Sequence, residues 1–172
     1  EFKGDILEIE HHTAHLSSAF HVSPFDKALV VSIDGFGDFA SSAWGIGEDI
    51  KINLKDRIYF PHSLGIFYQA LTQYLGFNNY GDEYKVMGLA PYGKPVYLSE
   101  MREIVKLAPD GKFKLNLNFF RHHKEKIDYK WDNCAPVIGQ LFSNNLEKLL
   151  GSIRKKNETI TLTSIKLLAK RP

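Results

Sequence analysis

The sequence contains, at residues 28–38, the segment Ala28-Leu-Val-Val-Ser-Ile-Asp34-Gly35-Phe-Gly37-Asp38. Its first residues are mostly aliphatic and β-branched, which favours a buried strand, and the glycines after Asp34 favour a tight turn. A carboxylate at the carboxyl end of such a strand lies where open α/β sheets place their ligands. The segment therefore predicts an α/β fold and makes Asp34 a candidate site residue. As an alternative, Asp34 is a turn former that caps its own loop.

Patterns on either side of this segment extend the prediction. Strand patterns at 39–46 and 50–54 complete, with the first strand, a three-stranded antiparallel meander. Apolar residues at helical spacing predict helices, and a late alternating pattern predicts one more strand. The helices are expected at 4–20, 63–75, 82–89, 97–107 and 137–150, and the strand at 111–119. The expected architecture is a mixed sheet flanked by helices.

Composition predicts a globular cytoplasmic chain. Of its 172 residues, 44% are hydrophobic, which excludes wholesale disorder. The net charge of +2 divides into +5 over residues 152–172 and −3 over the remainder, so neither a nucleic acid nor a membrane surface is expected as partner. The longest apolar runs fall far below the ~18 residues that cross a bilayer. The single cysteine, Cys134, excludes an intrachain disulfide and fits a reducing compartment.

Two histidines on the first predicted helix form a candidate metal site. His11 and His15 are four residues apart, so their side chains emerge from one face of the helix. His12 points elsewhere, and it occupies the position where zinc peptidases need glutamate, which excludes that class. Together with Asp34, the pair makes a facial site for iron(II), manganese or zinc. The alternative is a pair of partly exposed, hydrogen-bonded helix histidines.

Two further segments are candidates for contact with a nucleotide. Gly35, Gly37 and Asp38 form a turn whose backbone can approach phosphate oxygens closely, although it matches neither a Walker A loop nor a dinucleotide fingerprint. A bare hairpin turn is the alternative. In the segment 81–93, Glu83 and Lys85 are candidates for contact with a ribose or phosphate, and their alternative is a surface charge pair.

Three segments together resemble one family. They are Glu10-His-His-Thr-Ala-His15, Val31-Ser-Ile-Asp34-Gly-Phe-Gly-Asp38 and the stretch from Tyr80 to Gly93. In this order and spacing they closely resemble the cytoplasmic O-carbamoyltransferases of nodulation-factor and antibiotic biosynthesis. The resemblance covers residues 8–92, and its third segment is the most distinctive.

The resemblance implies a ribonuclease H-like, actin-like ATPase fold, related to the protein that makes threonylcarbamoyl-adenosine in tRNA. In this family a second domain makes carbamoyl-adenylate from carbamoyl phosphate and ATP. The actin-like domain then transfers the carbamoyl group to a hydroxyl-bearing small molecule and releases AMP. By motif position, the resemblance implies iron(II), or zinc or manganese, on His11, His15 and Asp34, with His15 and Asp34 as catalytic residues. The implied nucleotide contacts are Gly35, Gly37, Asp38, Glu83 and Lys85.

The match also implies that the chain is a piece of a larger enzyme. Residues 1–150 are expected to form part of the actin-like domain, and 151–172 a basic tail outside the resemblance. The family's adenylate-forming domain and a further aspartate ligand are expected in the part that is lacking, so turnover by the isolated chain is not expected. Two alternatives stay open: a non-catalytic fragment that binds nucleotide or metal, and a relative that acts in tRNA threonylcarbamoylation or hydrogenase maturation.

Overall fold

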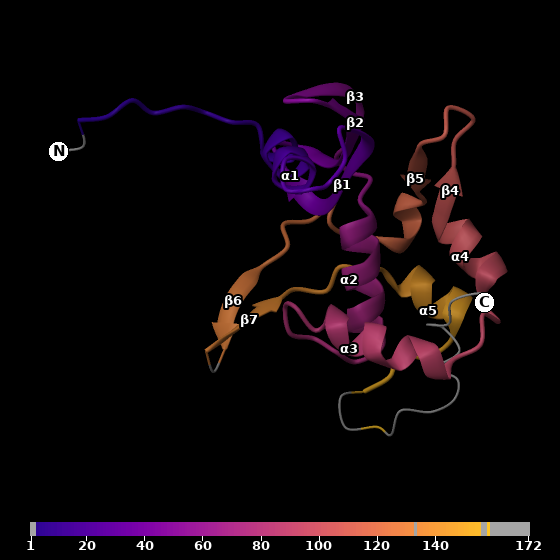
Figure 1. Ribbon diagram of the computed structural model, residues 1–172. Helices are drawn as coiled ribbons and strands as arrows, with labels where there is room; N and C mark the ends of the chain where they lie inside the picture. Colours follow the sequence, from indigo (N-terminus) through magenta and orange to yellow (C-terminus); the bar gives the residue numbers. More distant parts are fainter. Residues whose placement is uncertain (1–2, 133, 156–157, 159–172) are drawn as a thin grey trace. The chain divides into compact units, whose positions relative to one another are not determined.

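A computed structural model describes residues 3–132, 134–155 and 158. The chain divides into two compact units, residues 1–65 and 66–172 (Figure 1). Most of the predicted basic tail lies outside the described residues. Among the described residues, no helix combines the length and the apolar character that a membrane span requires.

The first unit is built on a three-stranded antiparallel sheet in the order β1-β2-β3. Its strands are β1 (Lys27–Gly37), β2 (Ala40–Glu48) and β3 (Lys51–Tyr59). Gly37 pairs with Ala40, and Glu48 pairs with Lys51, so consecutive strands are joined by short hairpin turns. The predicted meander is confirmed.

The turn between β1 and β2 lies later than the sequence predicts. β1 does not end at Asp34 but continues to Gly37, with an irregular register between Ile33 and Gly37. The turn is made by Asp38 and Phe39, whose φ angles are 49° and 64°. Positive φ at both central residues matches the twist of the two strands, which is why such turns close two-residue hairpins.

The first helix is shorter than predicted, and the expectation of a helix over 4–20 is wrong in its first part. Helix α1 spans His11–Phe20, and Glu10 is its N-cap. The Glu10 side chain accepts hydrogen bonds from the first free amides of the helix, which fixes its start there. The apolar residues before the cap, Ile6, Leu7 and Ile9, are exposed and cover no core.

The core of the first unit lies between α1 and one face of the sheet. Leu16 and Phe20 of α1 pack with Val30 of β1 and Ala43 of β2, all of them buried. The opposite face of β1 is open, because the alternating residues Leu29, Val31 and Ile33 are 53–66% exposed. The predicted fully buried strand is therefore buried on one face only.

The second unit contains most of the helices and two short hairpins. Helix α2 (Leu64–Tyr74) begins in the first unit, and α3 (Glu83–Leu89), α4 (Leu98–Ile104) and α5 (Asn144–Leu150) follow. The 3₁₀ turns are η1 (Ala90–Tyr92) and η2 (Leu117–Phe119), and the hairpin strands are β4 (Val105–Leu107), β5 (Phe113–Leu115), β6 (Tyr129–Asp132) and β7 (Ala135–Ile138). All three sheets among the described residues are antiparallel, so the mixed sheet expected from the sequence is not found there.

Helix ends and short strands account for the differences in this unit. The prediction of α2 is confirmed. Gly76 follows the helix with a φ of 81°, and the Phe77 N–H donates to the Thr72 carbonyl, a hydrogen bond that closes the end of the helix. The helix expected at 97–107 stops at Ile104, since residues 105–107 pair with β5 instead. The helix expected at 137–150 is wrong in its first half, which contains part of β7, and Ser143 caps the real helix α5.

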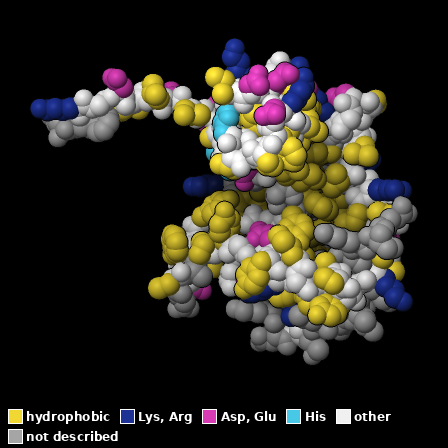
Figure 2. Space-filling view, in the orientation of Figure 1, with side chains coloured by type: hydrophobic (Ala, Val, Ile, Leu, Met, Phe, Trp, Pro, Cys, Tyr) yellow, Lys and Arg dark blue, Asp and Glu magenta, His cyan; other side chains and the backbone are white. Residues whose placement is uncertain are grey.

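The β6–β7 hairpin was not predicted, and its exposed aromatic residues explain why. Tyr129 and Trp131 on β6 are 66% and 79% exposed, and hydrophobic side chains gather over this hairpin in Figure 2. An alternating strand pattern requires one face to be buried, and all four residues of β6 are exposed. The predicted strand at 111–119 is likewise shortened to β5 and followed by η2.

Candidate metal centre

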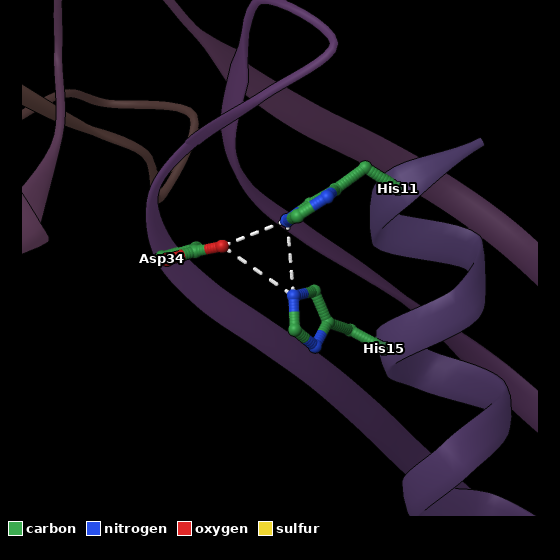
Figure 3. A group of neighbouring side chains, drawn as sticks. All are labelled: His11, His15 and Asp34. Carbon is green, nitrogen blue, oxygen red and sulfur yellow. Dashed lines mark hydrogen bonds and ion pairs between the residues drawn. The ribbon is translucent and has the colours of Figure 1, made fainter.

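Three side chains that are far apart in the sequence converge at one place in the first unit (Figure 3). His11 and His15 extend from α1, and Asp34 extends from β1. The Asp34 Oδ2 atom lies 2.7 Å from His11 Nε2 and 3.4 Å from His15 Nε2. The two imidazole nitrogens are 3.0 Å apart. The structure therefore brings together the three residues proposed as metal ligands.

The spacing of these atoms fits a divalent metal ion. Nitrogen and oxygen ligands lie ~2.1 Å from such an ion, so neighbouring ligand atoms on one face are separated by about 3.0–3.4 Å. The three observed separations fall close to that range. Within the described residues, this is the group of His, Cys, Asp or Glu side chains close enough to share an ion. The three side chains are 38–49% exposed, so solvent and a substrate can reach them.

The surroundings of Asp34 favour its ionised, ligand-competent form. Partial burial raises the pKa of Asp34, but hydrogen bonds from His11 and from the Gly35 amide outweigh it, and the pKa falls below its ordinary value. The Gly35 N–H donates to Asp34 Oδ1 at 2.6 Å, which leaves Oδ2 facing the histidines. A carboxylate held in this way presents one oxygen to the centre.

Gly37 makes room for the imidazole of His11. A Cβ atom at this position would lie 2.5 Å from His11 Nε2, and closer still to the Cδ2 and Cγ atoms of the ring. The ring of His11 therefore lies directly on the backbone of β1. By contrast, a Cβ atom at Gly35 would meet nothing within 4 Å. The two glycines of the turn thus differ: Gly37 is needed for the histidine, and Gly35 leaves open space.

Residues at the start of α2 hold the backbone that carries Asp34. The Ser63 hydroxyl donates to the carbonyls of Asp34 and Gly35, at 3.1 and 2.7 Å. Gly65 packs so closely that a Cβ atom there would lie 2.7 Å from the Asp34 carbonyl oxygen. Since both contacts involve main-chain atoms, they fix the position of the Asp34 Cα rather than its side chain.

Two carboxylates anchor the start of α1 beside the histidines. Glu10 accepts hydrogen bonds from the amides of His12 and Thr13, and Arg57 of β3 donates to it at 3.2 Å. Asp38 accepts from the backbone N–H of His11 at 2.9 Å. Asp38, proposed above for the phosphate side of a pocket, thus also ties the hairpin turn to the first ligand. Negative charge at a helix N-terminus stabilises the helix.

The anchoring by Glu10 predicts an acid-dependent loss of stability. Partial burial opposes its ionisation, but hydrogen bonds from Thr13, Arg57 and His12 lower the pKa of Glu10 from 4.5 to about 2. A lowered pKa contributes stability that is complete above the ordinary value and is lost as the pH falls from about 4.5 towards 2. Glu10→Gln should lower the free energy of unfolding at neutral pH by about 1 kcal/mol.

Urea unfolding at neutral and acidic pH measures this effect, with Glu8→Gln as the matched control, because Glu8 is exposed. The difference between wild type and Glu10→Gln should shrink as the pH drops through the window, whereas Glu8→Gln should track wild type throughout. A constant difference at every pH would show that the carboxylate charge is not what anchors the helix.

The two remaining candidate residues belong to the second unit. Lys85 of α3 forms an ion pair with Asp82, its Nζ lying 2.6 Å from Oδ1, and this pairing raises the pKa of Lys85. Glu83 is the first residue of α3. Lys85 is thus part of a charge pair, as in the alternative interpretation of this segment, but its partner is Asp82 rather than Glu83.

Sequence reasoning did not predict the structural roles of several residues around the centre. These roles depend on contacts between segments that are far apart in the sequence. Arg57 pairs with the cap Glu10, Ser63 donates to the Asp34 backbone, and Gly37 makes room for His11. One of them had a visible signal: Glu10 stands three residues before Thr13, whose side chain and amide both bond to it. The others involve long sequence separations that a local pattern does not contain.

Comparison with known proteins gives one family model and several similar proteins. Residues 1–166 match the family model described as the carbamoyltransferase N-terminus. The chain is 44% identical over 118 residues to the uncharacterised protein sll1178 of Synechocystis. It is 40% identical over 113 residues to the nodulation protein NolNO of Sinorhizobium fredii, and 41% identical over 113 residues to the nodulation protein NolO of Bradyrhizobium diazoefficiens.

These similarities cover most of this chain but little of each relative. They extend over 68% of the chain for sll1178 and 64% for each nodulation protein. The chain spans 19%, 16% and 20% of the length of sll1178, NolNO and NolO, respectively. The matched region is therefore a small part of each longer protein.

Proposed function

This chain belongs to the carbamoyltransferase family, and from that premise we propose that it is part of an O-carbamoyltransferase whose divalent metal is held by His11, His15 and Asp34. The metal proposed is iron(II), with zinc or manganese as alternatives. The donor proposed is carbamoyl-adenylate, made from carbamoyl phosphate and ATP, and the acceptor is the hydroxyl of a small molecule. The proposed site of the reaction is the cytoplasm.

One observation carries this proposal: the ligand atoms of the three residues converge within 4.8 Å of one another. The residues come from two different elements, a helix and a strand, and lie 19 positions apart between His15 and Asp34. Local helix geometry explains why His11 and His15 are neighbours, but it does not explain the carboxylate between them. Two imidazoles and a carboxylate are suited to iron(II), zinc and manganese.

The proposed reaction exchanges one bond to the carbamoyl carbon for another. The acceptor hydroxyl oxygen bonds to that carbon, the bond from carbon to the phosphate oxygen breaks, AMP leaves with the electron pair, and the hydroxyl proton is released. A bound metal would supply Lewis acidity towards a phosphate or carbamoyl oxygen. Direct attack by the acceptor requires no serine or cysteine nucleophile.

The chain's own residues have distinct parts in this scheme. His15 and Asp34, whose side chains are 49% and 39% exposed, are proposed as the catalytic residues that face the reacting groups. The backbone of Gly35 and Gly37, together with Asp38, lies next to the centre and is proposed to face the phosphate of the adenylate. Glu83 and Lys85 of the second unit are proposed as further contacts of the nucleotide.

The proposed architecture is the incomplete lobe of an actin-like ATPase fold. The meander of β1, β2 and β3 with helix α1 packed on it, and the family membership, support this proposal. The longer relatives leave room for an adenylate-forming domain elsewhere in the polypeptide. Since the chain spans a small part of each relative, turnover is proposed for the parent protein rather than for this chain alone.

Calorimetry with the full-length parent protein tests the function. The metal-loaded parent should bind carbamoyl-adenylate, and removal of the metal with a chelator should weaken this binding at least about tenfold, a loss of ~1.4 kcal/mol. ATP serves as the control ligand, because it lacks the carbamoyl group. Failure of the metal-loaded parent to bind carbamoyl-adenylate more tightly than ATP would exclude the proposed donor.

A further inference from the structure

We propose that the buried His12 is a positioning residue: its hydrogen bond to Ser32 sets the position of the helix that carries His11 and His15 relative to the strand that carries Asp34. The inference rests on the proposed metal centre and assigns a task to a histidine that is not one of its ligands. His12 adjoins His11 in the sequence, and Ser32 stands two residues before Asp34.

The contact joins the two elements from which the ligands come. His12 Nδ1 lies 2.9 Å from Ser32 Oγ, and both residues are buried, with exposed fractions of 0% and 7%. Successive side chains of a strand alternate between its faces, so Ser32 and Asp34 extend from the same face of β1. That face is the one covered by α1, because Val30 on it packs against Leu16 and Phe20.

A directional contact is needed because the rest of this interface is apolar. The other contacts between α1 and the sheet are apolar and non-directional, and such packing tolerates small shifts of the helix along the sheet. They are made by Leu16, Phe20, Val30 and Ala43. The centre does not tolerate such shifts, since ligand atoms must be held to within ~0.5 Å of a working geometry. A hydrogen bond between a fixed serine and a fixed imidazole specifies one position of α1 on β1.

The burial of His12 shows that this position is maintained at some cost to stability. Its Nε2 atom is buried and has no hydrogen-bond partner among the residues that the structure describes. A buried polar atom without a partner destabilises a fold, and an apolar residue of similar size would avoid this. His12 is not a fourth ligand, because its ring centroid lies 5.3 Å from that of His11 and 6.1 Å from that of His15, and its ligand atoms fall outside the converging group.

Metal affinity of variants of this chain tests the inference, with cobalt(II) as the probe, since its visible spectrum reports ligand geometry. Ser32→Ala should weaken cobalt binding about 10–100-fold, the range typical when a residue that orients a ligand is lost. It should also change the cobalt spectrum. Ser32→Thr, which keeps the hydroxyl, should restore affinity and spectrum.

A double variant separates positioning from stability. Ser32→Ala combined with His12→Leu replaces both hydrogen-bonding partners by apolar groups, so its thermal stability should recover towards wild type. Its cobalt affinity should stay as low as that of Ser32→Ala. Phe20→Leu is the control, because it loosens the same core at the far end of α1 and should lower stability without changing affinity.

The outcomes also separate this inference from the proposed function. If wild-type protein fails to bind cobalt, the metal centre itself is contradicted. If wild type binds and the double variant binds equally tightly with an unchanged spectrum, the metal centre stands and the positioning role of His12 is refuted. An equal loss of affinity in Phe20→Leu would also refute it, because general loosening of the core would then suffice.

Discussion

His15→Ala is expected to reduce the affinity of the chain for iron(II) or zinc by more than about 100-fold, beyond the range seen for residues that only orient ligands. The side chain of His15 is 49% exposed, and its Nε2 atom lies 3.0 Å from His11 Nε2 and 3.4 Å from Asp34 Oδ2. Its removal therefore takes away one ligand without opening a cavity in the core. The fold should be retained, so the loss of metal is a direct effect.

Elemental analysis of purified protein and a zinc titration measure this loss. His21→Ala is the matched control, because His21 is an exposed histidine that follows the last residue of the same helix. His21→Ala should bind metal as wild type does. Equal metal content in His15→Ala, His21→Ala and wild type would show that the converging side chains do not hold the ion.

Gly37→Ala is expected to abolish metal binding almost as completely as removal of a ligand. The added methyl group would occupy the space of the His11 ring, at 2.5 Å from its Nε2 atom. Because the ring is at the end of a side chain, it can swing away while the backbone of β1 stays in place. The expected result is a folded protein with a melting temperature near that of wild type and a metal affinity lowered about 100-fold.

Gly35→Ala is the control for this substitution, since a methyl group there meets nothing within 4 Å. Its metal affinity should match wild type. Circular dichroism and a cobalt titration on the two variants compare the outcomes directly. If Gly35→Ala and Gly37→Ala lose metal equally, or neither does, contact with His11 is not the reason for glycine at position 37.

The sequence allowed the three candidate ligands to be singled out, because each has a local signal. The spacing of His11 and His15 places both on one face of any helix, and Asp34 follows a β-branched run that ends near a turn. The meander could be predicted for the same reason, since alternation and turn residues lie within a few positions of each other. The convergence of His11, His15 and Asp34 depends on how α1 packs on β1, and no local pattern contains that information.

Elements whose limits depend on distant partners were harder to predict. Residues 105–107 have helical neighbours, but they become β4 because they pair with β5 across a turn. Val137 and Ile138 fit a helical apolar pattern, yet they pair with β6. At Glu10 the limit is local but was overlooked, because the apolar residues Ile6, Leu7 and Ile9 continue the helical period although they face solvent.

The half-exposed state of the ligand side chains has a practical consequence for work with the protein. The proposed site, whose ligand side chains are 38–49% exposed, would exchange a bound ion readily with the medium, because water and small chelators can reach it directly. Affinity among first-row divalent ions follows a general order, so the ion retained depends strongly on which one is supplied. Any metal recovered after aerobic purification would therefore record the history of the sample, and a test of the proposed iron(II) would need anaerobic handling without chelating resins.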